Sequence, residues 1–178
     1  DVRTRPRASM LPPPACKPTA KEEPVYFAAG EALCELAIGE GSALYRDLYD
    51  SGLINSNFGG GLDSSRGHCC LVFGGESPDP ETVADKIKAA FAALSKGISD
   101  EDFSRIKSKL CGRILNSYNT PIGAGRIANE AFFSGVAPFA HAEAYFLLKK
   151  SDLEMMLSKE IDSSRFALST VTGFEKQS

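Results

Sequence analysis

The most regular hydrophobic pattern in the chain covers residues 80–94, where apolar residues recur every three or four positions. Asp79 suits the position just before a helix, and Pro80 suits its first turn. The apolar stripe comprises Val83, Ile87, Ala90, Phe91 and Leu94. A second stripe follows the N-cap Ser99 and comprises Phe103, Ile106, Leu110, Ile114 and Tyr118. Both patterns predict an amphipathic helix with one face packed on a core.

Weaker patterns predict the other helices. One is expected over residues 31–38, and another begins after the N-cap Ser42 and stops at Gly52. Thr120-Pro121 predicts the start of a further helix, and residues 139–148 predict the next. Ser151 and Glu154 have the spacing of a capping box, which predicts a short last helix.

Four segments predict strands from their β-branched and aromatic content: residues 25–29, 53–58, 68–73 and 166–172. Between the second and third of these strands lie Gly59-Gly60-Gly61 and Asp63-Ser64-Ser65, which favour a flexible hairpin connection. The order of elements predicts an α+β fold, in which helices cover one face of a mostly antiparallel sheet. A doubly wound sheet is excluded because strands and helices do not alternate.

The chain is expected to contain one domain between two peripheral segments. Residues 1–24 are rich in proline and include Pro12-Pro13-Pro14, so they are predicted to form a linker or an arm outside the core. The domain itself is predicted over residues 25–173. Residues 174–178 are predicted to be a tail.

Composition narrows the class of protein. The net charge of -3 shows no basic footprint, so no nucleic-acid partner is expected. No apolar run is long enough to cross a bilayer, so no membrane partner is expected either. The 5 cysteines are an odd number, which favours free thiols in a reducing compartment and predicts a cytoplasmic location. Cys34 and Cys111 fall on apolar helix stripes and are expected in the core.

The residues needed for zinc hydrolysis are not present as a motif. The chain has 2 histidines, His68 and His141, and contains neither an H-x-x-E-H nor an H-E-x-x-H string. His68 and Cys70 share one face of a predicted strand and could hold part of a metal site, but a plain strand histidine is the favoured interpretation. Gly123-Ala124-Gly125 follows a helix rather than a strand, so it predicts a tightly packed helix start and not a dinucleotide site. No catalytic residue, metal ligand or cofactor is therefore predicted in this chain.

One segment carries a family resemblance. Residues 42–54, SALYRDLYDSGLI, resemble the insulinase, pitrilysin and mitochondrial processing peptidase family. The resemblance is greatest to its bacterial zinc-peptidase-like branch, which is associated with modification of elongation factor P. Supporting segments are GGESPDP at 74–80, DFSRIK at 102–107, LNSYNTP at 115–121 and FALS at 166–169. Together they cover roughly residues 22–173.

The resemblance implies the LuxS/MPP-like metallopeptidase fold, with two related domains that enclose a peptide chamber. In that family the zinc motif lies in the N-terminal domain, so zinc is expected only in the N-terminal half of a parent protein. This chain resembles the C-terminal domain. The expected function is a non-catalytic domain that completes a peptide-binding chamber. The expected partners are the N-terminal domain of the same parent or a paralogous insulinase-family subunit, together with a peptide substrate.

Two other functions remain open at this stage. The chain could be the second half of an active zinc metalloendopeptidase whose H-x-x-E-H motif lies upstream. Alternatively, it could be an interaction module that pairs with a paralogous peptidase-like subunit.

The resemblance also suggests substrate-binding residues. Active relatives place an Arg and a Tyr seven residues apart just after the helix at 43–50, where they contact substrate. The aligned positions here are Tyr49 and, depending on a one-residue gap, Asn55 or Ser56, so the pair is not retained. Arg46, one helical turn earlier, could substitute. Relatives have extra residues before Glu31, which predicts a segment missing between Gly30 and Glu31.

Overall fold

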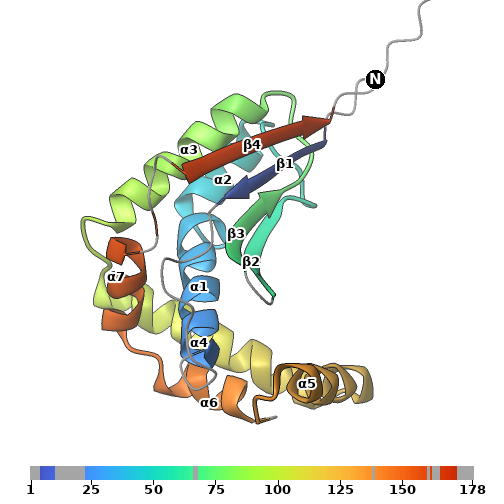
Figure 1. Cartoon of the computed structure of the whole chain (residues 1–178). Coiled ribbons are helices and arrows are strands. Elements are labelled where there is room, and N and C mark those ends of the chain that lie inside the picture. Colours follow the sequence, from blue (N-terminus) through green and yellow to red (C-terminus); the bar gives the residue numbers. More distant parts are fainter. Residues whose placement is uncertain are drawn as a thin grey trace, which may run out of the picture.

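A computed structural model describes residues 5–10, 23–65, 68–137, 139–159, 161 and 165–171. Within these residues the elements are β1 (Arg5–Met10), α1 (Glu23–Ile38), α2 (Ala43–Asp50), β2 (Gly59–Ser65), β3 (His68–Gly74), α3 (Pro80–Leu94), α4 (Asp100–Tyr118), α5 (Pro121–Ser134), α6 (Ala140–Leu147), α7 (Lys150–Lys159) and β4 (Phe166–Val171). Figure 1 shows their arrangement.

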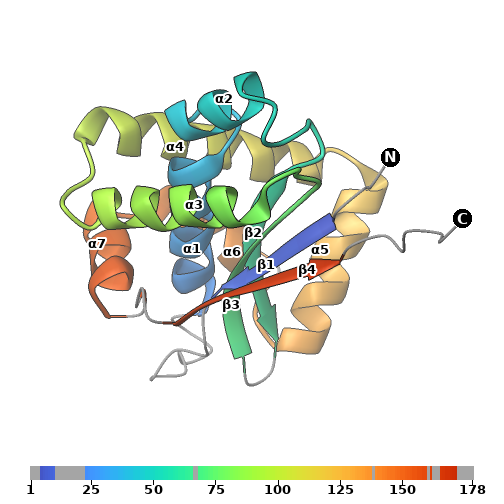
Figure 2. The same cartoon turned by 90° about the horizontal axis from the view of Figure 1, so that it is seen from above.

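The four described strands form one antiparallel sheet in the order β2-β3-β1-β4. The hairpin of β2 and β3 runs in register from Gly59 opposite Gly74 to Ser65 opposite His68. Helices α1, α2 and α3 lie on one side of the sheet (Figure 2). The expected α+β fold, a mostly antiparallel sheet covered on one face by helices, is confirmed.

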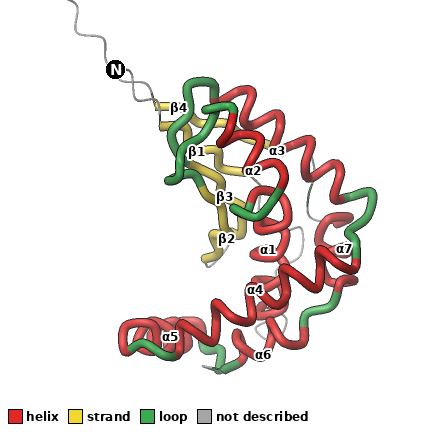
Figure 3. The backbone as a smooth tube through the Cα atoms, turned by 180° about the vertical axis from the view of Figure 1, so that it is seen from behind, coloured by secondary structure: helices red, strands yellow, loops and turns green. Residues whose placement is uncertain are grey.

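Seen from behind, the described chain has the shape of a C (Figure 3). The sheet forms one arm and α5 the other, while α1 and α4 form the back between them. Helix α5 packs against the end of α4, which carries it away from the sheet. Helix α5 therefore projects from the rest of the described chain.

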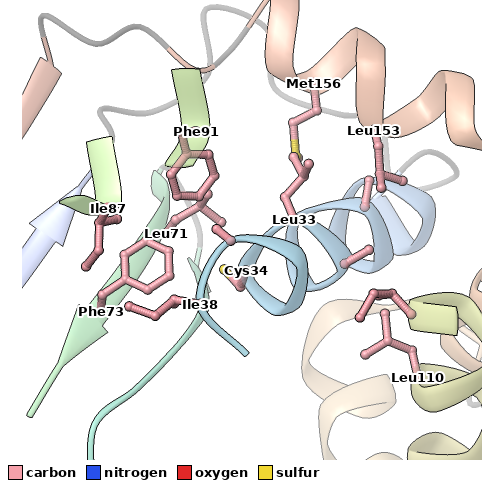
Figure 4. Close-up of a cluster of buried hydrophobic side chains, with 14 of the residues drawn as sticks. Leu33, Cys34, Ile38, Leu71, Phe73, Ile87, Phe91, Leu110, Leu153 and Met156 are labelled. Carbon is pink, nitrogen blue, oxygen red and sulfur yellow. The ribbon is translucent and has the colours of Figure 1, made fainter. Parts of the chain in front are cut away.

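The core is built around α1, which packs on the sheet, on α3 and on α7. Cys34 and Ile38 lie on the side of α1 that faces the β3 residue Phe73, whereas Leu33 faces Met156 of α7 (Figure 4). The ring of Phe73 is fully buried and lies 5.8 Å from the ring of Phe91 on α3. Cys34 is buried and Cys111 packs against the same cluster, as expected for small apolar side chains.

The helices predicted from periodicity and capping are confirmed. The hydroxyls of Ser42 and Ser99 accept hydrogen bonds from the backbone amides of Tyr45 and Asp102, both at 3.0 Å. Asp79 caps α3 in the same way, and Thr120 caps α5 through the amide of Gly123. A Cβ at Gly123 would lie 2.0 Å from the carbonyl oxygen of Ser117, so the predicted tight helix start is also confirmed.

The predicted arm at residues 1–24 is wrong for Arg5–Met10, because these residues form an interior strand of the sheet. Strand β1 pairs with β3 from Arg7 opposite Gly74 and with β4 from Arg5 opposite Val171. Nothing in the local sequence Arg-Pro-Arg-Ala-Ser-Met indicates a strand. Pairing on both sides, with residues far along the chain, overrides the weak local preference. Residues 11–22 and the predicted tail at 174–178 lie outside the described residues.

The predicted strand at 25–29 is wrong as well, since these residues belong to α1. Ala28, Ala29, Ala32 and Leu33 are all buried, which is the spacing of a helix face and not of a strand. Pro24 is tolerated because it lies in the first turn. Helix α1 runs unbroken through Gly30 and Glu31. The missing segment expected between these two residues stays a prediction.

The predicted strand at 53–58 is wrong because its backbone amides are engaged elsewhere. Leu53 and Ile54 both donate to the carbonyl oxygen of Leu48, at 2.9 and 3.3 Å, and so complete the end of α2. Gly52 adopts a φ of 71°, the left-handed conformation that ends a helix. Strand β2 begins only at Gly59, so the three glycines belong to the strand and not to a loop.

The predicted capping box at Ser151 is displaced by a few residues. Helix α7 begins at Lys150, and the Asp152 carboxylate accepts a hydrogen bond from the backbone amide of Lys149 at 2.8 Å. The short last helix is therefore confirmed, but Asp152 and not Ser151 supplies the side chain that caps it.

Candidate functional site

The four candidate substrate-binding residues lie at the end of α2 and in the loop that follows it. Arg46 and Tyr49 are exposed on α2, Ser56 is exposed in the loop, and Asn55 is half-buried there. The guanidinium of Arg46 donates to the carbonyl oxygen of Gly41 at 3.5 Å, which directs it toward the start of α2. Arg46 therefore lies on the same helix as Tyr49 but is turned away from the loop of Asn55.

The ring of Tyr49 is presented at the surface on a rigid support. It stacks on Tyr45, with centroids 6.2 Å apart and planes only 9° from parallel. Tyr45 is buried in the core, whereas the Tyr49 side chain is 51% exposed. Stacking on a fixed neighbour limits the conformations of an exposed aromatic ring and favours its use as a contact surface.

Asn55 holds the loop in place. Its amide nitrogen donates to the Glu76 carboxylate at 3.0 Å, and its amide oxygen accepts from the backbone of Asn57 at 3.0 Å. The first bond ties the α2–β2 loop to the segment between β3 and α3. Both polar atoms of the Asn55 amide are therefore already engaged, and this makes it a less suitable peptide ligand than Tyr49.

Sequence reasoning missed a cluster of four charged side chains between two helices, here called the α1–α4 charge cluster: Glu31, Glu35, Lys109 and Arg113. The Glu35 carboxylate lies 2.7 Å from the Lys109 ammonium and 3.1 Å from the Arg113 guanidinium. Arg113 also bonds to Glu31, whose other oxygen accepts from the backbone amide of Leu62 in β2 at 3.3 Å. The sequence held one signal for this cluster. Glu31 and Glu35 are four residues apart, as are Lys109 and Arg113, so each pair lies on one face of its helix.

Zinc binding is not supported by the residues that the structure describes. Among the described residues, no group of three or more His, Cys, Asp or Glu side chains is arranged so that it could hold a metal ion. The two neighbouring carboxylates of Glu31 and Glu35 are neutralised by Lys109 and Arg113 and so do not form a metal cage. The side chain of His68 lies outside the described residues, so its predicted proximity to Cys70 is untested. His141 packs edge-on against the ring of Phe27.

Two of the described thiols, those of Cys70 and Cys111, are not activated for nucleophilic chemistry. Burial raises the pKa of the Cys70 thiol, and the nearby Asp63 carboxylate raises it further. Burial also raises the pKa of Cys111, against a smaller opposing effect of Lys107. Both groups are therefore protonated at neutral pH, whereas a nucleophilic cysteine requires a lowered pKa.

Helices α5 and α6 carry a group of exposed apolar side chains, here called the α5–α6 apolar surface: Ile122, Phe132, Phe133, Phe139, Phe146 and Leu147. Phe132 and Phe133 are 81% and 68% exposed and contact one another edge to face. Phe139 stacks on Tyr118 of α4. Of the described side chains of α5, only Ala131 is buried. A helix that is apolar on most sides normally packs against further protein.

None of the described helices combines the length and the apolar character required to cross a bilayer.

Residues 20–110 match the sequence profile of the Peptidase M16 inactive domain. Over 139 residues the chain is 23% identical to the uncharacterized zinc protease YmfH of Bacillus subtilis, and this match covers 78% of the chain but 32% of YmfH. The chain thus spans about a third of the length of this curated relative.

Two solved structures share the fold. One is a protein of Alicyclobacillus acidocaldarius described as an M16-like peptidase, with a TM-score of 0.81 and 20% identity over 95% of this chain and 40% of that one. The other is described as the inactive peptidase domain of a zinc protease from Bordetella parapertussis, with a TM-score of 0.75 and 21% identity over 98% of this chain and 93% of that one. The family resemblance found in residues 42–54 falls inside the matched profile.

Proposed function

We propose a function from the premise that this chain belongs to the M16 (insulinase) peptidase family as an inactive domain. In this proposal the chain completes a peptide-binding chamber together with a zinc-bearing domain. The chain itself is the non-catalytic domain of a zinc-protease-like protein. The zinc-bearing domain would be the N-terminal half of the same parent or a paralogous subunit. A cytoplasmic location, and a domain that ends near residue 173, are part of the same proposal.

One observation carries this proposal: the α5–α6 apolar surface is exposed although it consists of large apolar side chains. Leaving such side chains in water forgoes roughly 1.5–3 kcal/mol each compared with burial. Helix α5 projects from the back of the C and has few contacts with its own domain, so it is free to pack against a neighbour. Exposed phenylalanines at a projecting helix are typical of the central contacts of protein–protein interfaces.

The double substitution Phe132→Ser and Phe133→Ser is expected to weaken pairing with the zinc-bearing domain by about thirtyfold, which corresponds to one interface hot spot. Both rings are exposed, so the thermal stability of the chain alone should be unchanged. The measurement is a titration of the chain against the purified H-x-x-E-H-bearing domain of the parent. Met155→Ser on α7, which is 50% exposed, is the matched control. Equal affinity of the double variant and the control contradicts docking through this surface.

In the peptide side of the proposal, Tyr49 contacts substrate at the end of α2, and Arg46 contacts it nearer the start of the same helix. Ser56 and the loop held by Asn55 would line the same end of the helix. The support for this placement is the exposed, stacked ring of Tyr49, which offers a preorganised apolar face to an extended peptide.

With zinc and a fluorescent unfolded peptide, the chain is expected to bind the peptide without cleaving it. Tyr49→Ala should weaken this binding about tenfold, as expected for the loss of one aromatic contact. Leu115→Ala is a suitable control because Leu115 is exposed to the same extent, 51%, but lies on α4. Fluorescence anisotropy reports binding and gel analysis reports cleavage. Turnover of the peptide by the chain alone, or identical binding by both variants, contradicts the proposal.

A further inference from the structure

Strand β2 lies at one end of the sheet, next to β3 only, in the described part of the chain. The backbone groups on the free side of an outer strand can pair with a strand from another molecule. Gly59, Gly60 and Gly61 make up the first half of β2, so no side chains there hinder such pairing. An outer strand of this kind requires some form of protection if the chain is to avoid self-association.

The amide of Leu62, in the middle of β2, is not left open. It donates a hydrogen bond to the Glu31 carboxylate of α1 at 3.3 Å. A strand amide points to one side of its strand, and the acceptor of this one is a helix side chain, which indicates that it points away from β3. The Glu31 oxygen thus occupies the place that the carbonyl oxygen of an added strand would take.

The contact between α1 and β2 is close enough to hold the carboxylate at the level of the strand backbone. A Cβ at Gly30 would lie 2.8 Å from the Leu62 side chain, and a Cβ at Gly61 would lie 3.3 Å from the Glu31 carboxylate. Glycine at both positions therefore allows the helix and the strand to approach one another. This approach brings the Glu31 side chain, only 17% exposed, over the backbone of β2.

Arg113 fixes the orientation of Glu31. Its guanidinium, which comes from α4, bonds to the second Glu31 oxygen. It also bonds to Glu35, so its own position is held by two carboxylates. Both oxygens of the Glu31 carboxylate are consequently bonded, and the side chain cannot rotate away from Leu62 without losing its ion pair with Arg113.

We propose that Glu31 closes the free edge of β2 against antiparallel pairing with the β2 strand of a second copy of this chain. The α1–α4 charge cluster acts as the support that keeps this carboxylate on the edge. The device is independent of the proposed docking of α5, because β2 and α5 lie on different arms of the C.

Replacement of Glu31 is expected to promote self-association through β2. Glu31→Ala frees the Leu62 amide, so the self-association constant measured by sedimentation should rise about tenfold, the gain expected from one additional backbone hydrogen bond. At high protein concentration, the amides of Gly60 and Leu62 should become more protected from hydrogen exchange.

Glu35→Ala is the matched control. It removes the same charge from the same helix and also breaks a bond to Arg113, together with one to Lys109, but both partners of Glu35 lie on α4 and not on the strand. Glu31→Gln is a second control, which loses the ion pair but keeps an oxygen that can accept from Leu62. Glu35→Ala leaves the bond between Arg113 and Glu31 in place and should associate like the unchanged chain. Glu31→Gln should associate less than Glu31→Ala, because its side-chain oxygen can still accept from Leu62.

The pattern of outcomes decides the proposal. Association by Glu31→Ala, with neither control following, supports it. If Glu31→Ala stays at the association constant of the unchanged chain while its β2 amides exchange faster, Glu31 merely anchors the strand and the proposal is wrong. If Glu35→Ala associates equally, the loss of charge and not the closed edge is responsible, and the proposal is likewise wrong.

Discussion

Replacement of Phe73 by alanine is expected to lower the free energy of unfolding by about 3–5 kcal/mol. The Phe73 side chain is fully buried at the junction of β3, α1 and α3, where Ile38, Ile87 and Phe91 surround it (Figure 4). Its removal leaves a cavity that three different elements border, so the site cannot collapse by the movement of one of them. Chemical denaturation followed by circular dichroism measures the change.

The control for this prediction is Phe132→Ala on α5, which removes the same atoms from a side chain that is 81% exposed. It should change the free energy of unfolding by no more than about 0.5 kcal/mol. Should Phe73→Ala prevent folding altogether, Phe73→Leu gives a measurable intermediate value. A loss below about 1 kcal/mol for Phe73→Ala contradicts the central position of this ring in the core.

Alanine at Gly60 is expected to cost about 1–3 kcal/mol of stability, the usual effect of excess volume in a packed core. Gly60 lies opposite Phe73 in the β2–β3 register, and a Cβ added there would be 2.1 Å from the Phe73 Cδ1 atom. The ring can occupy the core only because no side chain is present at position 60. Denaturant unfolding under the conditions used for Phe73 measures the cost.

Gly59→Ala is the matched control, because a Cβ at the neighbouring glycine has no atom within 4 Å. It should be neutral or slightly stabilising, since alanine restricts the unfolded chain. The double variant of Gly60→Ala with Phe73→Leu should cost less than the sum of the two single changes, because the smaller side chain makes room for the methyl group. Additive losses, or equal losses at positions 59 and 60, contradict the proposed steric role of Gly60.

The candidate site illustrates what a sequence resemblance can and cannot locate. The segment at residues 42–54 correctly predicted α2 and its Ser42 cap, because both signals are local, whereas substrate binding by its residues stays a prediction. It did not reveal that Asn55 is tied to Glu76, nor that Arg46 is turned toward Gly41. The first of these contacts joins residues that the fold alone brings together, and the second depends on the conformation of a long side chain. Both lie beyond a local pattern.

The sequence by itself determined the helices with a clear stripe and a capping residue, above all α3 and α4, because both signals act within a few neighbouring residues. It also determined the family, through residues that lie inside the matched profile. Only the tertiary structure decided that Arg5–Met10 is a strand, since its partners in β3 and β4 come from later parts of the chain. In the same way, the packing of α1 on β2 placed Glu31 at the amide of Leu62, and the pairing of β2 with β3 placed the ring of Phe73 over Gly60. Both positions depend on contacts between elements and not on local preference.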